Sequence, residues 1–205
     1  MGLLASSVSM TRYRFVEPPP DSLWPEIPKR LKQYSFKDID QSADERSFGW
    51  VNFDDMLDSD WVDAVPDKGE YLAFALRLDT RRISPAVLKK HLQLALQQAE
   101  VKARGEGRKY LSRDDKKEVK EQTRLRLLAR ALPIPALFEV AWNTKTNIVY
   151  LASTNSKVRD LFVDLFSATF ELHLDPLTPQ ALALALLGEE AEHRLQNIEP
   201  ALFIG

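Results

Sequence analysis

The chain has 205 residues, of which 44% are hydrophobic and 28% charged, a composition typical of a soluble globular protein with a core of its own. Its formal net charge is −2, and it contains no cysteine, which excludes a disulfide framework, a thiolate metal site and a cysteine nucleophile. No apolar run reaches the roughly 18 residues of a membrane span, so we expect no membrane contact and a cytoplasmic location.

The N-terminus carries no secretory signal, because no basic stretch is followed by an apolar core. Residues 1–6 formally match an N-myristoylation pattern, but a glycine and a serine at this spacing are common by chance. We interpret this stretch as the approach to a first strand. Alternation and β-branched and aromatic content predict that strand over residues 8–16.

A short helix is predicted next, because Trp24, Ile27 and Leu31 have spacings of three and four and share one face. Residues 34–46 are mostly polar and are predicted to form a loop. Residues 47–53 are apolar and aromatic at many positions, which predicts a second strand.

An acidic loop follows over residues 54–67, and six aspartates suggest a calcium site there. An EF-hand loop needs ligands at alternate positions, a central glycine and a terminal glutamate. This loop has no glycine, and apolar residues interrupt the aspartates. We therefore interpret it as a solvated acidic connector.

Residues 70–78 are almost continuously apolar, which predicts a central strand covered on both faces. Ser84 as N-cap and Pro85 at the first helical position predict a helix that ends near Gly105. Its apolar stripe consists of Leu88, Leu92, Ala95 and Ala99.

A basic turn at residues 107–109 leads into a second helix, predicted from Ser112 to about Leu132. Ser112 and Asp115 have the spacing of a capping box, with aspartate in place of the usual glutamate or glutamine. Pro133 ends this helix.

A hairpin is predicted from strands at residues 137–142 and 148–152, joined by a polar connection. A third helix then begins at Asn155 or Ser156. Its apolar stripe consists of Val158, Leu161, Phe162, Leu165 and Phe166. Trp50 and Trp142, which could stack on nucleic-acid bases, are interpreted as core residues because they lie in predicted strands.

A short strand is predicted over residues 171–175, and a last helix from residue 178 to Gly188. Residues 189–205 are interpreted as a tail or a docking segment, and the sequence leaves both open. The predicted fold is a single α+β domain over residues 1–188. It has an antiparallel-rich sheet with helices packed on it and a long basic helical pair between strands.

Positive charge is concentrated in residues 77–130, which contain 16 Lys and Arg against 7 Asp and Glu, a net charge of +9. The remaining residues contain 12 Lys and Arg against 23 Asp and Glu, a net charge of −11. A concentrated positive field attracts polyanions even when the whole protein is near neutral. This asymmetry indicates nucleic-acid binding.

The second helix of the basic segment places cations at spacings of three and four on one face. Like charges at this spacing are mildly destabilising, and pairs such as Glu121 with Arg124 give partial relief. Such a face is often merely solvated, but several spaced cations suit phosphate contacts. The predicted DNA-binding residues are Arg81, Arg82, Lys89, Lys90, Arg108, Lys109, Arg113, Lys116, Lys117, Lys120 and Arg124.

Sequence reading of the DNA is not predicted, because the chain has no zinc-finger pattern, leucine zipper or RNP signature. Catalysis is not predicted either, and we expect no catalytic residue, metal or cofactor. His91, His173 and His193 stand alone in the sequence, and no glycine-rich phosphate loop is present. A metal-dependent nuclease needs converging carboxylates, and the sequence leaves open whether Asp54, Asp55 and Asp79 converge.

Several stretches resemble the bacterial recombination-associated RdgC family. The most specific is Gly107-Arg108-Lys109 followed by the basic helix and a Leu-Pro break at Leu132-Pro133. The resemblance spans roughly residues 8–188. Its other parts are Gly49-Trp50-Val51, the stretch from Leu76 to Leu88 and the hairpin from Val140 to Ser153 followed by Lys157-Val158.

The resemblance implies an α+β, nucleoid-associated protein that binds double-stranded DNA without sequence preference. It also implies a ring-shaped homodimer that limits the access of the recombinase RecA to duplex DNA. Full-length family members continue with another α/β portion beyond the position of Gly188, whereas this chain stops at Gly205. Encirclement of DNA therefore stays open here, whereas binding along a basic face does not depend on it. One alternative is a metal-dependent exonuclease, after the label that family members carry. The other is a module whose basic helix pairs with an acidic protein, or with the acidic loop at residues 54–67 of a second copy.

Overall fold

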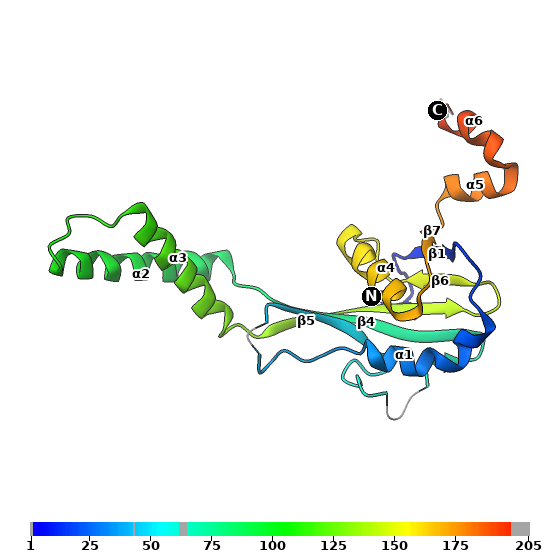
Figure 1. The fold of residues 1–205 in the computed structure, drawn as a ribbon, viewed down its shortest axis with the longest axis horizontal. Coiled ribbons are helices and arrows are strands. Elements are labelled where there is room, and N and C mark those ends of the chain that lie inside the picture. Colours follow the sequence, from blue (N-terminus) through cyan, green and yellow to red (C-terminus); the bar gives the residue numbers. More distant parts are fainter. Residues whose placement is uncertain (1, 43, 62–64, 198–205) are drawn as a thin grey trace. The chain divides into compact units, whose positions relative to one another are not determined.

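The computed structural model describes residues 2–42, 44–61 and 65–197. These residues form an α+β fold with a seven-stranded antiparallel sheet, which confirms the predicted class (Figure 1). The strands are β1 (Thr11–Phe15), β2 (Arg46–Asn52), β3 (Asp67–Lys68), β4 (Tyr71–Arg81), β5 (Pro133–Asn143), β6 (Ile148–Leu151) and β7 (Leu174–Pro176). Their order in the sheet is β2-β4-β5-β6-β1-β7, and β3 pairs with β4.

Helices are inserted between these strands along the chain, and the long pair lies between β4 and β5 in sequence, as predicted. The helices are η1 (Asp21–Glu26), α1 (Ile27–Gln33), α2 (Pro85–Gly105), α3 (Arg113–Leu128), α4 (Ser156–Phe170), α5 (Pro179–Leu187), η2 (Glu189–Ala191) and α6 (Glu192–Gln196). No helix in the described ranges is long and apolar enough to cross a membrane.

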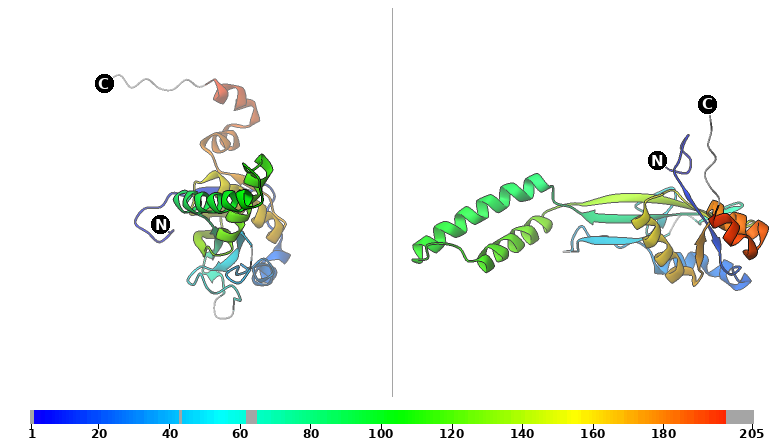
Figure 2. Two further views of the ribbon diagram at one scale, coloured as in Figure 1. Left: turned by 90° about the vertical axis from the view of Figure 1, so that its left-hand side faces the viewer. Right: turned by 90° about the horizontal axis from the view of Figure 1, so that it is seen from above.

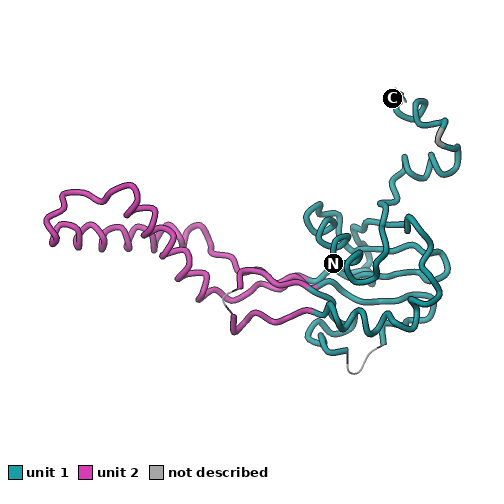
Figure 3. The backbone as a smooth tube through the Cα atoms, in the orientation of Figure 1, with its two compact units in different colours: residues 1–35, 49–76, 137–205 teal, residues 36–48, 77–136 magenta. Residues whose placement is uncertain are grey.

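The chain divides into two compact units, which Figure 3 colours separately. Unit 1 consists of residues 1–35, 49–76 and 137–205, and unit 2 of residues 36–48 and 77–136. One boundary lies between α1 and β2, and the other three fall within β2, β4 and β5. The single domain expected over residues 1–188 stays a prediction.

Unit 1 contains an aromatic core, which explains why its strands and α4 are rich in large apolar residues. Trp50 and Trp142 are fully buried, as predicted, and the Nε1 of Trp50 donates a hydrogen bond of 2.8 Å to the hydroxyl of Thr169. Trp142 lies 5.7 Å from Phe166 between ring centroids. Aromatic pairs at such separations add to the stabilisation that burial alone provides.

The hairpin of β5 and β6 is confirmed, since β5 ends at Asn143 and β6 begins at Ile148. Val140 faces Leu151 across this pair, and both are buried. On the other side of β6, β1 is antiparallel to it and also pairs with the short β7. Asn155 caps α4 by accepting a hydrogen bond from the backbone N–H of Lys157, as predicted.

Several element ends differ from the predictions. The first strand covers Thr11–Phe15 rather than residues 8–16, and α3 ends at Leu128 rather than near Leu132. The prolines at 133 and 135 lie within β5 instead of preceding it. Proline disfavours helical geometry in the residue before it, so the two prolines favour an extended backbone. The strand therefore begins four residues earlier than the apolar pattern suggested.

The predicted polar loop at residues 34–46 contributes to packing. Phe36 and Ile39 are buried in it, and backbone carbonyls of the loop accept hydrogen bonds from the side chain of Arg81. The two-residue β3 was not predicted. Of the expected tail, residues 189–196 form the short helices η2 and α6, and residues 198–205 lie outside the described ranges.

Candidate nucleic-acid interface

The basic segment forms a helical hairpin within unit 2, in which α2 and α3 lie side by side (Figures 1 and 2). The predicted stripe of α2 is half-buried throughout, and Ala103 in its last turn is buried. Alanine and leucine side chains thus fill the space between the two helices. The outward faces carry the charged residues, and this division follows directly from the 3.6-residue period.

The start of α3 is fixed by the predicted capping box. The Ser112 hydroxyl accepts a hydrogen bond of 3.0 Å from the backbone N–H of Asp115, and the Asp115 carboxylate accepts one of 3.0 Å from the backbone N–H of Ser112. These bonds with Ser112 hold the pKa of the Asp115 carboxyl below its ordinary value, and the positive charge of Arg108 adds to the effect.

Most of the predicted DNA-binding side chains reach solvent. Arg124 is half-buried and Arg81 is buried. The exposed members are Arg82, Lys89, Lys90, Arg108, Lys109, Arg113, Lys116, Lys117 and Lys120. Exposed cations outside the predicted set also lie on the hairpin, among them Arg104 and Arg126. Arg104 belongs to α2 and Arg126 to α3, and their spacing in the sequence alone did not distinguish them.

Two cations of the predicted set are neutralised within the protein. Arg108 pairs with Glu106 at 2.6 Å and with Asp115 at 3.3 Å, and the hydrogen bond that it donates to the Glu106 carboxylate raises the pKa of its guanidinium. Arg124 pairs with Glu45 at 3.1 Å and, as predicted, with Glu121 at 3.3 Å. Among the residues that the structure describes, the other exposed cations of the set make no ion pair.

These unpaired cations determine what the hairpin can do chemically. Like charges three or four residues apart repel each other and oppose helix formation. An external polyanion relieves that repulsion, because each phosphate adds an attractive contact and releases bound counterions. The hairpin therefore offers a surface of exposed positive charge that suits a phosphate backbone.

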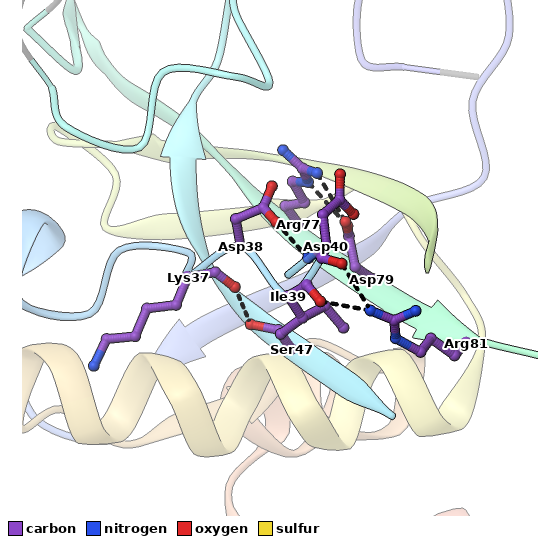
Figure 4. Close-up of polar contacts among 8 residues, drawn as sticks. All are labelled: Lys37, Asp38, Ile39, Asp40, Ser47, Arg77, Asp79 and Arg81. Atoms are coloured by element: carbon purple, nitrogen blue, oxygen red, sulfur yellow. Dashed lines mark hydrogen bonds and ion pairs between the residues drawn. The ribbon is translucent and has the colours of Figure 1, made fainter. Parts of the chain in front are cut away.

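Arg81 has a different environment from its exposed neighbours in the set (Figure 4). Its side chain is 7% exposed, and its Nη2 donates to the backbone carbonyls of Ile39 at 2.6 Å and Ser42 at 3.0 Å. Its Nε donates to the carbonyl of Asp44 at 3.0 Å, and its Nη1 donates to the carbonyl of Ala131. The guanidinium thus binds backbone carbonyls before β2 and after α3 rather than projecting into solvent.

The family comparison includes all of unit 2, with the whole hairpin, and most of unit 1. The chain matches the family model described as "Putative exonuclease, RdgC" over residues 9–189. The chain belongs to the RdgC family. A comparison with curated proteins finds no match.

The exonuclease description directs attention to the carboxylates of this RdgC-family chain. Asp79 is 2% exposed, and its two oxygens accept hydrogen bonds of 2.9 and 2.7 Å from the Nε and Nη2 of Arg77. Asp54 belongs to unit 1 and pairs with Lys68 at 2.6 Å. In the described ranges, no three or more His, Asp or Glu residues are grouped so that they could hold a metal ion.

Arg77 also stacks on an aromatic ring, with its guanidinium carbon 4.1 Å from the centroid of Phe36. The hydrogen bonds that Arg77 donates to the Asp79 carboxylate are the main reason that the pKa of Arg77 is raised. In the sequence, Asp79 was considered only as a possible nuclease carboxylate, and its pairing with Arg77 was not predicted. The signal was present, since Arg77, Asp79 and Arg81 alternate along β4 and so point to one face.

Proposed function

We propose that this RdgC-family chain binds double-stranded DNA through its phosphate backbone, without sequence preference and without cleaving it. By occupying duplex DNA it would limit the access of RecA and so modulate homologous recombination at the nucleoid. The supporting observation is the set of exposed cations on α2 and α3 that have no acidic partner among the described residues.

The mechanism follows from the type of side chain. Lysine presents a compact charge on a flexible stem, so it binds phosphate oxygens from many directions, and such contacts carry no sequence information. Lys116, Lys117 and Lys120 are exposed on α3, and Lys89 and Lys90 are exposed on α2. Contacts of this kind give an affinity that depends steeply on salt and little on sequence.

The bound protein would then compete with RecA by covering duplex DNA rather than by cleaving it. A homodimer would double the number of phosphate contacts without any new type of contact, and two linked binding surfaces release DNA more slowly than one. The homodimer and its closure into a ring are proposals carried over from the family. Sedimentation of the free chain at several concentrations tests the dimer directly.

The deciding experiment is fluorescence anisotropy of a labelled duplex at salt concentrations from 50 to 200 mM. If about six phosphates are contacted, affinity should fall on the order of a thousandfold across this range. Changing Lys116, Lys117 and Lys120 to Glu should remove most binding at 200 mM salt and flatten the salt dependence.

The matched control changes Lys29, Lys32 and Lys157 to Glu, three exposed lysines of unit 1. It alters the net charge by the same amount and should bind nearly as the unmodified chain does. Equal losses in both variants would mean that only total charge matters. No binding at low salt would reject the proposal and favour the module that pairs with an acidic protein.

The family description supports a second candidate function, that of a metal-dependent exonuclease. The test is incubation of a 5′-labelled linear duplex with the protein and Mg²⁺ or Mn²⁺, followed by electrophoresis. Cleavage that tracks protein concentration and vanishes with chelator would establish the nuclease. An intact duplex under conditions of full binding agrees with the non-catalytic proposal.

A further inference from the structure

The turn between α2 and α3 contains a hollow of about 180 Å³ within unit 2. Its lining comes from the last turns of α2, the connecting residues and the first turns of α3. The lining residues are Glu100, Arg104, Lys109, Tyr110, Leu111 and Lys116. Three of the six are cations and one is an acid, so the hollow carries a net positive charge.

The three cations are available to a ligand. In the part of the chain that the structure describes, Arg104, Lys109 and Lys116 make no ion pair. The neighbouring Arg108 differs, because Glu106 and Asp115 both pair with it. Two acids of this turn are therefore already neutralised, and Glu100 is the one acid that lines the hollow.

Tyr110 is the most exposed aromatic side chain among the described residues, at 78% compared with 41% for Phe48. The ammonium of Lys109 lies 5.7 Å from the centroid of the Tyr110 ring. A ring so exposed contributes little to packing. Exposed aromatic rings beside cations are the device by which proteins hold unpaired bases, because the ring stacks on the base while the cations hold the phosphate.

The backbone on both sides of this ring is held in place. The N–H of Arg108 donates a hydrogen bond of 2.8 Å to the carbonyl of Ala103, and Gly107 has a positive φ of 81° that ends α2. The capping box holds Ser112 on the other side. The hollow is thus preorganised, which reduces the entropy that a ligand must overcome.

We propose that this hollow binds one unpaired nucleotide of DNA, with its phosphate held by Arg104, Lys109 and Lys116 and its base stacked on Tyr110. This proposal rests on the proposed function and goes beyond it. Phosphate contacts along α2 and α3 do not distinguish paired from unpaired DNA. A stacking site does, and would favour DNA with accessible bases, such as single strands and frayed ends.

The experiment compares two fluorescein-labelled probes with equal phosphate charge, a twelve-residue oligothymidylate and a twelve-residue abasic oligonucleotide. The unmodified chain should bind oligothymidylate at least about fivefold more tightly, the lower range for one stacked base. Tyr110→Ala should bind both probes equally, at the affinity of the abasic probe. Its salt dependence should be unchanged, because no phosphate contact is lost.

Two further variants make the result specific. Tyr110→Phe keeps the ring and should keep the preference for bases, while Tyr71→Ala removes another exposed tyrosine, outside the hollow, and should also keep it. Circular dichroism melting should be the same for Tyr110→Ala and the unmodified chain, since the ring is exposed.

The outcomes separate the two proposals. Equal binding of both probes by the unmodified chain, or a preference that survives in Tyr110→Ala, would overturn the nucleotide site. If duplex binding stays steeply dependent on salt in that case, the proposed function still holds. If neither probe nor duplex binds at low salt, both proposals are wrong.

Discussion

At the scale of single residues, Arg81 and Arg82 are chemically identical neighbours with opposite environments. Arg81 donates to backbone carbonyls of Ile39, Ser42 and Asp44, whereas Arg82 is exposed. A guanidinium suits the first role, because its five N–H groups lie in a planar fork and can reach several acceptors at once. An ammonium at the same position has three donors close together and leaves some carbonyls unpaired.

Arg81→Lys should therefore lower the free energy of unfolding by about 3 kcal/mol, as two or more buried carbonyls lose their donors. Arg82→Lys is the matched control and should change stability by less than about 0.5 kcal/mol. Urea denaturation measures both. If Arg81 instead contacts phosphate, Arg81→Lys will leave stability unchanged, and Arg81→Gln will lower the salt dependence of DNA binding.

The buried pair of Arg77 and Asp79 leads to a second prediction. Asp79→Ala leaves the guanidinium of Arg77 buried without its carboxylate, which should cost about 3 to 5 kcal/mol of stability. Asp114→Ala, at an exposed position of α3, should cost far less. Chemical denaturation of the two variants compares them. A small effect at Asp79 would show that the pair is not structural and would reopen its role as a metal ligand.

At the scale of elements, sequence analysis was most accurate where the controlling contacts are local. The first helical residues of α2 and α3 follow from Pro85 after Ser84 and from the box of Ser112 and Asp115. Ser84 is the N-cap residue, although its hydroxyl makes no capping hydrogen bond in the described structure. The turn between β5 and β6, before Ile148, was also predicted correctly, because its controlling contacts are local.

Elements whose partners lie far away in the chain were not predictable in this way. The segment around Ile39 is polar and has no periodicity, and it is ordered because Arg81, 42 residues away, binds its carbonyls. The two residues of β3 are too few to give an alternating pattern. The same reason applies to Arg104 in the candidate site, since its place beside Lys116 depends on how α2 and α3 pack.

The capping box gives the third prediction. Ser112→Ala should lower stability by about 1 kcal/mol, the typical value for loss of an N-cap hydrogen bond. The contribution of the Asp115 carboxylate to stability depends on pH, because its pKa is held below the ordinary value of 3.8 in the folded protein. Its stabilising effect is then present above that value and is lost as pH falls through the lower, folded pKa.

The measurement is thermal unfolding of the unmodified chain and Asp115→Asn at neutral pH and near pH 3. The asparagine variant should be less stable at neutral pH, and the difference should shrink in acid as the carboxylate of the unmodified chain becomes protonated. A difference that stays constant with pH would contradict a role for the carboxylate charge.

At the scale of the whole molecule, the separation of charge along the chain matters more than its sum. The net charge is −2 and the sequence pI is about 6.0, values that by themselves suggest repulsion from DNA. Yet residues 77–130 carry +9, and the exposed cations of α2 and α3 belong to this segment. At physiological salt, charges more than about 8 Å from a phosphate are largely screened. A local cationic surface can therefore bind DNA on a protein that is acidic overall.

Substitutions in the acidic loop before β3 distinguish DNA binding by the basic helices from pairing of these helices with an acidic partner. Asp54 and Asp60 are exposed in that loop, and Asp54 pairs with Lys68 within unit 1. Changing both to Asn should tighten DNA binding by about twofold at low salt, and this gain should vanish at high salt, because the removed repulsion is screened there and no phosphate contact is altered.

Anisotropy titrations and sedimentation of the same double variant at 50 and 500 mM salt measure these effects. If the loop instead binds the basic helices of a second copy, the unmodified chain will self-associate more strongly at low salt and DNA will compete with that association. The double variant would then lose the self-association and bind DNA much more tightly than twofold. That result would make pairing of opposite charges between copies, rather than DNA occupancy alone, the main use of the basic helices.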